Sequence, residues 1–338
     1  MTEREVDELD VALLDALHIN PRARFEQLGP VLGVSPVTAA RRWRRLAENR
    51  QAWVSTVPGP RLELAAAVYD LECAPARAGE VSQALAELPW VASVYLTAGT
   101  FDVCALVFGP GMSTLSALLL DRLGAIPGVT RARTHVVTDW YSDVRWRLGA
   151  ISDSAERTVE PAGTSYHGPE PRVERFDDAE RALYLALQDD GRASYVELAE
   201  RLGASEQLVK RRLTALISRG ALAFRTDFVR TEGGWPTQLM LWLQVPDAAL
   251  REVAEAVARW AETRICLSVL GPANLFVKLQ LHRLADVQPL FDRICTRLPA
   301  GVIADRRLVL RPVKSWGRLL DGQGRRTRVI PVDLWASL

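Results

Sequence analysis

The chain of 338 residues is long enough for two or more domains, and its 48% hydrophobic and 25% charged residues are normal for a well-packed protein. Because its formal net charge is only +1, any attraction to nucleic acid has to come from local clusters of charge. No apolar run is long enough to span a membrane and the acidic N-terminus lacks the apolar core of a secretory signal, so we expect a cytoplasmic protein without membrane contact.

The cysteines and histidines give no sign of a metal or cofactor site. Four cysteines are scattered through apolar runs without a CxxC pair, and the four histidines lack metal-ligand spacing. We therefore expect reduced, buried cysteines, no metal and no cofactor. The sequence also lacks a P-loop, a GxGxxG turn after a strand and a GxSxG element, so we do not expect an enzyme.

Each of two similar segments predicts three helices. In the first segment, apolar residues at helical spacing predict a helix that ends before Pro21. A short second helix ends at Gly33, where a positive φ costs little. Ser35 can then cap a third helix that has Pro36 in its first position. Two helices joined by a tight glycine turn form a helix-turn-helix.

The second segment repeats the first. Residues 182–226 align without a gap with residues 12–56, at an offset of 170. The identical pairs are Leu17/Leu187, Arg22/Arg192, Leu28/Leu198, Leu32/Leu202, Gly33/Gly203, Ser35/Ser205, Arg41/Arg211, Arg42/Arg212 and Leu46/Leu216. This number of matches at one spacing indicates an internal duplication.

The third helix of the first copy has an apolar face and a basic face. Ala39, Trp43 and Leu46 form an inward stripe, while four arginines and no acid lie between residues 35 and 45. Because a solvated helix usually mixes both charge signs, this pattern predicts a recognition helix for the major groove of double-stranded DNA. The candidate DNA-contacting residues are Ser35, Val37, Thr38, Arg41, Arg42, Arg44 and Arg45.

The second copy is less basic. Thr214 and Ala215 stand at the positions of Arg44 and Arg45, so we expect the two heads to differ. The candidate DNA-contacting residues are Ser205, Gln207, Lys210, Arg211 and Arg212. We expect Arg41, Arg44, Arg45 and Arg211 at base edges, and Arg42 and Arg212 at phosphates or in local packing.

One position predicts backbone strain in the first copy. Arg50 stands where the second copy has Gly220. If this position needs a positive φ, Arg50 is mildly strained there, because side chains with a Cβ disfavour that region.

After each head, the pattern changes to strands and helices in the order βαββαβ, the ferredoxin-like split motif. These elements begin near residues 64, 76, 91, 101, 112 and 129 in the first copy, and near residues 237, 247, 264, 275, 284 and 302 in the second. One such unit covers a single face of its sheet with helices, so the other face has to be buried. We expect the two units to pair sheet to sheet.

The predicted fold class is α+β, with two copies of a winged helix-turn-helix head followed by a βαββαβ ferredoxin-like domain. The expected domains are head 1 (1–60), ferredoxin-like domain 1 (61–149), a flexible linker (150–175), head 2 (176–234), ferredoxin-like domain 2 (235–320) and a tail (321–338). The linker is expected because residues 150–171 are rich in Pro, Gly, Ser and charge.

This order of head and βαββαβ unit resembles the Lrp/AsnC (leucine-responsive/asparagine-operon) family of transcriptional regulators. The resemblance lies in LDVALLDALHINPRARFEQLGPVLGVSPVTAARRWRRL (9–46) and DAERALYLALQDDGRASYVELAERLGASEQLVKRRLTAL (178–216). Family members carry one copy and dimerise, so the resemblance implies that this polypeptide imitates the family dimer. It also implies a regulator that binds DNA, responds to an amino acid or related small molecule, and assembles further into a homo-oligomer.

The resemblance also implies an effector site in the loop between the two central strands, where the family has a Gly-x-x-Asp element. A carboxylate there suits an ammonium group, and a glycine loop offers backbone N–H groups. The candidate effector-binding residues are Thr97, Gly99, Thr100 and Asp102 in the first copy, and Gly271 and Asn274 in the second. The second pocket has lost the charge and is expected to bind less well. Alternatively, Asp102 only satisfies the local backbone of a hairpin.

A siroheme decarboxylase is the alternative function, because such enzymes resemble this family and pair two such subunits, sometimes in one chain. The resemblance implies histidines and a strand-borne arginine that face a tetrapyrrole. Residues 91–107 and 264–280 contain no histidine, while His135 and His282 lie elsewhere in the sequence, each isolated. A scaffold whose heads have lost DNA affinity is a third interpretation, which the basic first head disfavours.

Overall fold

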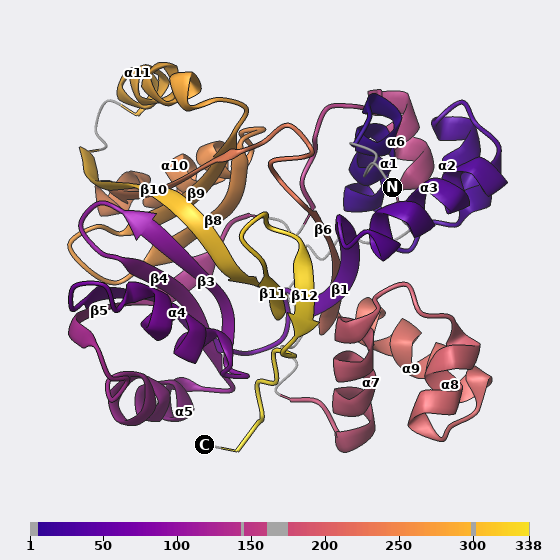
Figure 1. Ribbon diagram of the computed structural model, residues 1–338, viewed down its shortest axis with the longest axis horizontal. Coiled ribbons are helices and arrows are strands. Elements are labelled where there is room, and N and C mark those ends of the chain that lie inside the picture. Colours follow the sequence, from indigo (N-terminus) through magenta and orange to yellow (C-terminus); the bar gives the residue numbers. More distant parts are fainter. Residues whose placement is uncertain (1–5, 143–144, 161–174, 299–301, 338) are drawn as a thin grey trace. The chain divides into compact units, whose positions relative to one another are not determined.

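The computed structural model describes residues 6–142, 145–160, 175–298 and 302–337, which form two compact units (Figure 1). The first unit comprises residues 1–64, 144–229 and 325–333. The second comprises residues 65–143, 230–324 and 334–338. Each unit therefore contains chain from both copies, with the two heads in the first unit and the two βαββαβ segments in the second.

The first head has the three helices that the sequence predicts: α1 (Glu8–Ile19), α2 (Phe25–Val31) and α3 (Pro36–Glu48). Ser35 Oγ accepts a hydrogen bond from the backbone N–H of Thr38 at 3.1 Å, which confirms the predicted cap. Gly33 has a φ of +65°, so the turn between α2 and α3 uses the left-handed backbone that glycine tolerates.

The second head repeats this arrangement with α7 (Asp178–Asp189), α8 (Tyr195–Leu202) and α9 (Glu206–Ser218). Its inward stripe on α9 is buried and consists of Val209, Leu213 and Leu216. Arg50 has a φ of +61°, and Gly220 at the equivalent position has +65°. The predicted strain at Arg50 is therefore confirmed.

A single strand follows each head, namely β1 (Ala52–Pro58) and β6 (Leu222–Phe228). The two strands pair antiparallel, with Ser55 opposite Arg225, its equivalent at the offset of 170. Equivalent residues can face each other in this way only across a local two-fold axis. Each expected wing is therefore a single strand, and the two strands, one from each copy, pair with each other.

Part of the segment expected to be a flexible linker is a helix, α6 (Asp153–Val159), which packs against α1 and α2. The buried carboxylate of Asp15 accepts hydrogen bonds from the backbone N–H groups of Leu148, Ala150 and Ile151 at 2.7, 2.6 and 3.1 Å. The polar composition of this segment did not predict that it is ordered. Its order depends on one buried acid, Asp15 on α1, which lies far away in the sequence. Residues 161–174 of the expected linker lie outside the described residues.

The tail contains β12 (Arg326–Val329) and contacts both heads of the first unit. The guanidinium of Arg326 donates to the carbonyl of Ala47 at 3.0 Å, next to the end of α3. Gln188 on α7 exchanges two hydrogen bonds with the backbone of Val332. The described tail is therefore part of the packed structure.

The second unit contains an eight-stranded closed barrel. Its strands are β2 (Ala65–Cys73), β3 (Val91–Ala98), β4 (Val103–Gly109), β5 (Val129–Trp140), β7 (Thr237–Gln244), β8 (Thr263–Val269), β9 (Leu275–Leu281) and β10 (Val302–Ser315). The order is β10-β3-β4-β2-β5-β8-β9-β7, and β7 pairs with β10 to close the circle. Each copy contributes four strands in the ferredoxin-like order.

The barrel corrects the expected packing of one sheet on the other. The two four-stranded sheets join edge to edge, through β10 with β3 and through β5 with β8. Closure gives every edge strand a partner, although β5 pairs with β8 only from Val137 to Trp140.

Helices and short segments complete the second unit. They are α4 (Ala78–Ala86), α5 (Met112–Ala117) with the π-helical turn η1 (Leu118–Leu123), η2 (Asp247–Ala249), α10 (Leu250–Ala258), η3 (Leu284–Asp286), α11 (Val287–Arg297) and β11 (Arg318–Leu320). On β7, Leu239, Leu241 and Leu243 belong to the core that includes α10 and α11. Because side chains alternate along a strand, Met240 and Trp242 face the barrel interior instead.

A buried ion pair lies inside the barrel. The guanidinium of Arg307 on β10 donates to both carboxylate oxygens of Asp70 on β2, at 2.7 and 3.0 Å. Arg307 is 1% exposed, Asp70 is fully buried, and the guanidinium carbon lies 3.8 Å from the ring centre of Trp242. Arg307 also pairs with Asp305 at 2.7 Å, whereas fully buried Asp70 depends on Arg307, because an unpaired charge is costly in a low-dielectric interior.

Replacing Arg307 with alanine should lower the free energy of unfolding by about 3–5 kcal/mol, because it leaves Asp70 buried without its cation. The matched control Arg311→Ala, at an exposed position on the same strand, should change it by less than about 0.5 kcal/mol. Urea unfolding followed by tryptophan fluorescence measures both. Similar losses in the two variants would contradict the importance of the pair.

Lys314 is a second buried cation, near the other end of β10. It is fully buried, and its Nζ donates to the carbonyl of Leu88 at 2.9 Å. Burial lowers the pKa of Lys314 to about 7, although the nearby charge of Glu87 raises it in part. The folded state therefore releases a proton that an unfolded chain retains at neutral pH.

Stability should rise with pH because of Lys314. A lysine in an unfolded chain has a pKa near 10.4, so between pH 7 and 9 the unfolded state binds more protons, and the free energy of unfolding should increase by about 2 kcal/mol. The Lys314→Met variant should lose this increase. Equilibrium unfolding of both proteins at pH 7 and pH 9 tests this, and an equal rise in both would assign the effect to other groups.

Candidate functional site

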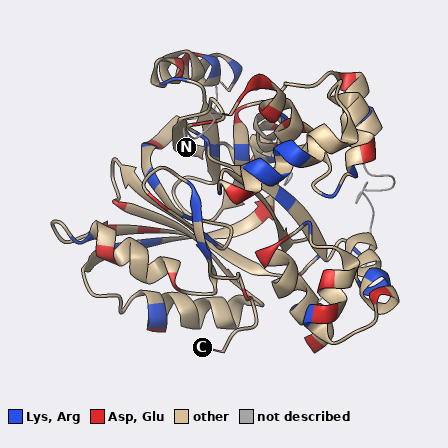
Figure 2. Cartoon of the chain, turned by 45° about the vertical axis from the view of Figure 1, so that its right-hand side comes forward, with Lys and Arg blue, Asp and Glu red and all other residues tan. Residues whose placement is uncertain are grey.

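The outer face of α3 presents two unpaired arginines. Arg41 and Arg44 are exposed, and Val37, one turn earlier, is 76% exposed (the basic turns of α3 are blue in Figure 2). Within residues 6–142, 145–160, 175–298 and 302–337, neither guanidinium has a hydrogen-bond or ion-pair partner. This face has the cationic character that DNA binding needs, and no described residue neutralises its two outer arginines.

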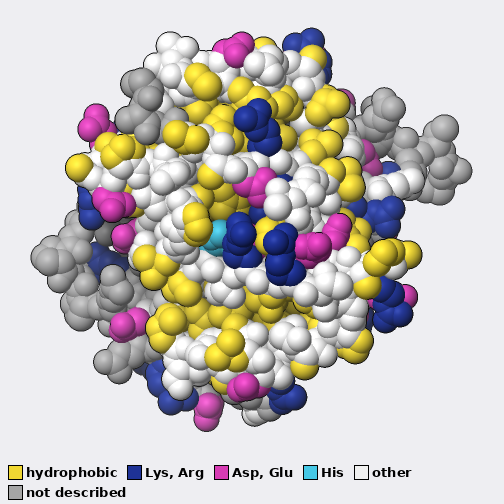
Figure 3. Space-filling view, turned by 90° about the vertical axis from the view of Figure 1, so that its left-hand side faces the viewer, with side chains coloured by type: hydrophobic (Ala, Val, Ile, Leu, Met, Phe, Trp, Pro, Cys, Tyr) yellow, Lys and Arg dark blue, Asp and Glu magenta, His cyan; other side chains and the backbone are white. Residues whose placement is uncertain are grey.

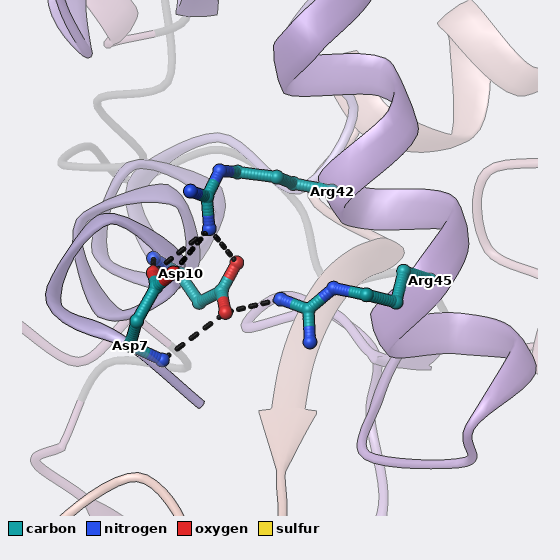
Figure 4. Close-up of polar contacts among 4 residues, drawn as sticks. All are labelled: Asp7, Asp10, Arg42 and Arg45. Carbon is teal, nitrogen blue, oxygen red and sulfur yellow. Dashed lines mark hydrogen bonds and ion pairs between the residues drawn. The ribbon is translucent and has the colours of Figure 1, made fainter. Parts of the chain in front are cut away.

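The other two arginines of α3 are used inside the first head (Figure 4). Arg42 Nη1 donates to both carboxylate oxygens of Asp7, at 2.8 and 2.7 Å, and to Asp10 at 2.9 Å. Arg45 pairs with the second oxygen of Asp10, which is fully buried. The hydrogen bond with Asp7 raises the pKa of Arg42. These contacts attach α3 to α1.

The four predicted DNA-contacting arginines of α3 therefore fall into two groups, one exposed and one paired inside the head. The sequence placed Arg45 at a base edge, but its ion pair with Asp10 commits it to the packing of the head. Arg42 packs locally, which was one of its two expected roles. Sequence reasoning missed the division because the acids lie on α1, more than 30 residues away.

The second head is built differently at the equivalent positions. Ala215 replaces Arg45, and Glu180, the equivalent of Asp10, pairs with Arg219 at 2.6 Å. On the outer face of α9, Gln207, Lys210 and Arg211 are exposed, and Arg212 is half-buried. The second head therefore presents cations without the four-residue cluster seen in the first.

The capping hydroxyls have a structural use. Ser35 Oγ and Thr38 Oγ1 lie 2.9 Å apart, so the two predicted contact residues hydrogen-bond to each other at the start of α3. Ser205 Oγ accepts from the backbone N–H of Leu208 at 3.3 Å at the start of α9. Each of these hydroxyls fixes where a recognition helix begins.

Side chains of the predicted effector loop of the first copy are hydrogen-bonded to other parts of the protein. Asp102 Oδ2 accepts from the backbone N–H of Cys73 at 2.7 Å, and Thr97 Oγ1 donates to the carbonyl of Phe101 at 2.6 Å. Thr100 Oγ1 donates to Asp305 at 3.0 Å. Asp102 therefore satisfies a backbone donor, as in the alternative interpretation, but this donor lies at the end of β2, 29 residues away, and not in the loop itself.

In the second loop, the side chain at the equivalent position also hydrogen-bonds to the backbone. Asn274 accepts from the backbone N–H of Val245 at 2.9 Å and donates to its carbonyl at 2.7 Å. Val245 is the equivalent of Cys73 at the offset of 172. Gly271, with a φ of +151°, lies so close to His135 that an added Cβ would be 3.2 Å from Nδ1. Effector binding by Thr97, Gly99 and the other loop residues remains a prediction.

His135 belongs to a charged cluster that the sequence did not reveal. Its Nε2 lies 3.3 Å from Asp70 Oδ2, and its ring centre lies 6.1 Å from that of Trp242. Within the described chain, neither imidazole nitrogen has a hydrogen-bond partner. The expectation that His135 is isolated is therefore wrong. The available signal was the offset of 172, which places His135 and Arg307 at equivalent positions of β5 and β10.

Arginines also surround Phe101 beside this cluster. The guanidinium carbons of Arg131, Arg133 and Arg307 lie 4.9, 5.3 and 4.8 Å from the ring centre of Phe101. Such contacts stabilise a cation by the electron-rich face of the ring. Figure 3 shows one face of the molecule on which a histidine and cationic side chains lie between areas of hydrophobic side chains.

The remaining candidate groups have structural surroundings. The ring of His282 lies tilted against that of Trp235, with ring centres 4.9 Å apart. Burial raises the pKa of Cys266 to about 12, whereas Cys295 is exposed, contrary to the expectation that every cysteine is buried. Among the described residues there is no group of three or more His, Cys, Asp or Glu that could hold a metal. None of the described helices is long and apolar enough to cross a membrane.

Comparisons with known families assign both heads and part of the barrel. Residues 6–47 match the AsnC-type helix-turn-helix domain, residues 67–146 match the Lrp/AsnC ligand binding domain, and residues 176–222 match a winged helix-turn-helix DNA-binding family.

Curated relatives include an uncharacterized HTH-type transcriptional regulator of Pyrococcus horikoshii, 23% identical over 150 residues, which are 44% of this chain and 94% of the relative. The HTH-type transcriptional regulator LrpA of Pyrococcus abyssi is 23% identical over 137 residues, which are 40% of this chain and 97% of the relative. Both relatives are thus matched over nearly their whole length by less than half of this chain.

A solved structure resembles the chain over almost all of its length. The siroheme decarboxylase NirDL, in complex with an iron-uroporphyrin III analogue, has a TM-score of 0.57 at 16% identity, and the match covers 97% of this chain and 96% of that chain. This likeness concerns the fold. The sequence matches in both heads and in the ligand-binding segment place the chain, with its two helix-turn-helix heads, in the Lrp/AsnC family of transcriptional regulators.

Proposed function

We propose that the chain is a sequence-specific DNA-binding transcriptional regulator in which one polypeptide takes the part of the family dimer. The principal support is the outer face of α3, where Arg41 and Arg44 are exposed and have no partner among the described residues. A guanidinium can donate two hydrogen bonds to O6 and N7 of guanine in the major groove. Residues in the first part of a recognition helix reach base edges, and Arg41 lies in the first half of α3.

The two arginines that pair inside the head fix the orientation of the recognition helix. Arg42 and Arg45 attach α3 to α1 through Asp7 and Asp10, so the recognition helix has a fixed orientation in its head. A fixed helix loses less conformational entropy when its exposed side chains bind DNA.

We also propose that the regulator responds to a small-molecule effector, an amino acid or a related metabolite. The match of residues 67–146 to a ligand-binding family supports this. In the loop, Asp102 uses Oδ2 for the backbone of Cys73, so Oδ1 is available for an ammonium group. Further assembly of chains into a homo-oligomer is part of the same proposal.

DNA binding should depend on the outer arginines. Arg41→Ala with Arg44→Ala should weaken binding to the upstream region of the protein's own gene by about 1–3 kcal/mol per lost base contact. It should also change the salt dependence if either side chain contacts phosphate. Gel shifts at several salt concentrations measure both effects.

The matched control is Arg122→Ala with Arg297→Ala. These two exposed arginines lie in the second unit, and their removal changes the net charge by the same amount. The control should bind like the wild type. Equal weakening in both variants would mean that only overall charge matters, and no binding at low salt would refute the proposed function.

A siroheme decarboxylase-like enzyme is the second candidate, which the cluster around His135 favours. A histidine can transfer protons near neutral pH, and a strand-borne arginine can bind a carboxylate. In this structure, however, Arg307 donates with both terminal nitrogens to Asp70, so its fork is not open to a substrate carboxylate. This is why we place the regulator first.

Incubation with siroheme under reducing, oxygen-free conditions separates the two candidates. We expect no loss of carboxylate groups from the tetrapyrrole, as followed by mass spectrometry. Turnover that disappears in His135→Ala and persists in the control His282→Ala, an exposed histidine, would establish the enzyme instead.

A further inference from the structure

We propose that a single chain binds an operator composed of two inverted half-sites whose base sequences differ. This inference rests on the proposed DNA-binding function and concerns which DNA the two heads recognise. It follows from the symmetry of the contacts between the heads and from the chemistry of the side chains that the two recognition helices expose.

The two heads are related by a local two-fold axis. In the β1–β6 pair, Ser55 faces its own equivalent, Arg225, and the pairing runs symmetrically outward to Ala52 with Phe228 and Pro58 with Leu222. A protein two-fold axis places recognition helices on DNA in opposite directions, so the sites that they read are inverted.

Reciprocal arginines fix the heads to each other. The guanidinium of Arg22 donates to the carbonyls of Gly191 and Ala193 at 2.6 and 2.9 Å. Arg192 donates to the carbonyls of Pro21 and Ala23, also at 2.6 and 2.9 Å. Every residue in one set is the equivalent of a residue in the other at the offset of 170.

Aromatic rings enclose both guanidinium groups. The guanidinium carbon of Arg22 lies 5.7 Å from the ring centre of Tyr195, and that of Arg192 lies 4.8 Å from the ring centre of Phe25. These contacts add to the hydrogen bonds, so each arginine fastens a turn of one head against the other. The protein itself thus sets the spacing between the recognition helices, and the half-sites have to match that spacing.

The outer faces of α3 and α9 share one exposed residue and differ at several positions, among them Ala40, whose equivalent is the exposed Lys210. Arg41 and Arg211 are equivalent and both exposed. One turn earlier, the first head exposes Val37 and the second exposes Gln207. One turn later, the exposed residues are Arg44 and Thr214.

These differences predict the bases. The arginine shared by both heads favours guanine at the same place in each half-site. Val37 suits the methyl group of thymine, whereas Gln207 can form two hydrogen bonds with adenine. Arg44 favours a further guanine in the first half-site, while the hydroxyl of Thr214 discriminates less. The operator is therefore an imperfect inverted repeat.

Selection of bound sequences from a random double-stranded library tests this with the full chain. We expect two inverted, unequal half-sites at one spacing, and one chain per operator in native mass spectrometry. Replacing either half-site by a copy of the other should weaken binding by about 5- to 150-fold per mismatched base pair. Inserting about half a helical turn between the half-sites should reduce binding to that of a single half-site.

Exchange variants assign the difference to the named residues. Val37→Gln with Ala40→Lys and Arg44→Thr gives the first head the outer face of the second at these positions, so the selected operator should become more nearly symmetric. Gln207→Val with Lys210→Ala and Thr214→Arg tests the same point from the other head, and the control Arg122→Ala with Arg297→Ala should keep the unequal half-sites. Circular dichroism verifies that each variant is folded.

The possible outcomes separate this inference from the proposed function. No enriched sequence and no binding at low salt would overturn the proposed function itself. Binding to a symmetric repeat, to a single half-site or to half-sites at variable spacing would leave the function standing and overturn the inference. An unchanged operator in both exchange variants would also overturn it.

Discussion

The backbone carbonyls of one turn in each head are satisfied by an arginine from the other head, and this exchange organises the first unit. Arg22 and Arg192 each leave their own turn and donate to the equivalent turn of the opposite copy. The strand edges of the barrel are also satisfied by the opposite copy, since β5 and β10 each pair with a strand of the other copy. Duplication thus supplies within one chain the contacts that a lone copy lacks.

A fused pair need not remain symmetric, and this chain has diverged at several equivalent positions. In the barrel, His135 and Arg307 are equivalents, and both lie against Asp70, whose own equivalent is Trp242. A homodimer would bring together two identical residues at each of these places. Here a carboxylate, an imidazole, a guanidinium and an aromatic ring form one buried cluster.

Local chemistry could be predicted from the sequence, whereas contacts between distant segments could not. The cap at Ser35, the turn at Gly33 and the positive φ of Arg50 follow from neighbouring residues, and all three are present. The partner of Arg45 is an acid on another helix, and the order of residues 148–151 depends on buried Asp15. Barrel closure also escaped prediction, because strand patterns do not specify which edges meet.

The strap formed by residues 325–333 has a consequence for synthesis of the protein. It is part of the same compact unit as residues 1–64, and it contacts Ala47 in the last turn of α3 and Gln188 on α7. A ribosome releases the beginning of this unit long before its last segment. The growing chain therefore has to keep an incomplete pair of heads until residue 333 has emerged, and the first unit is complete only then.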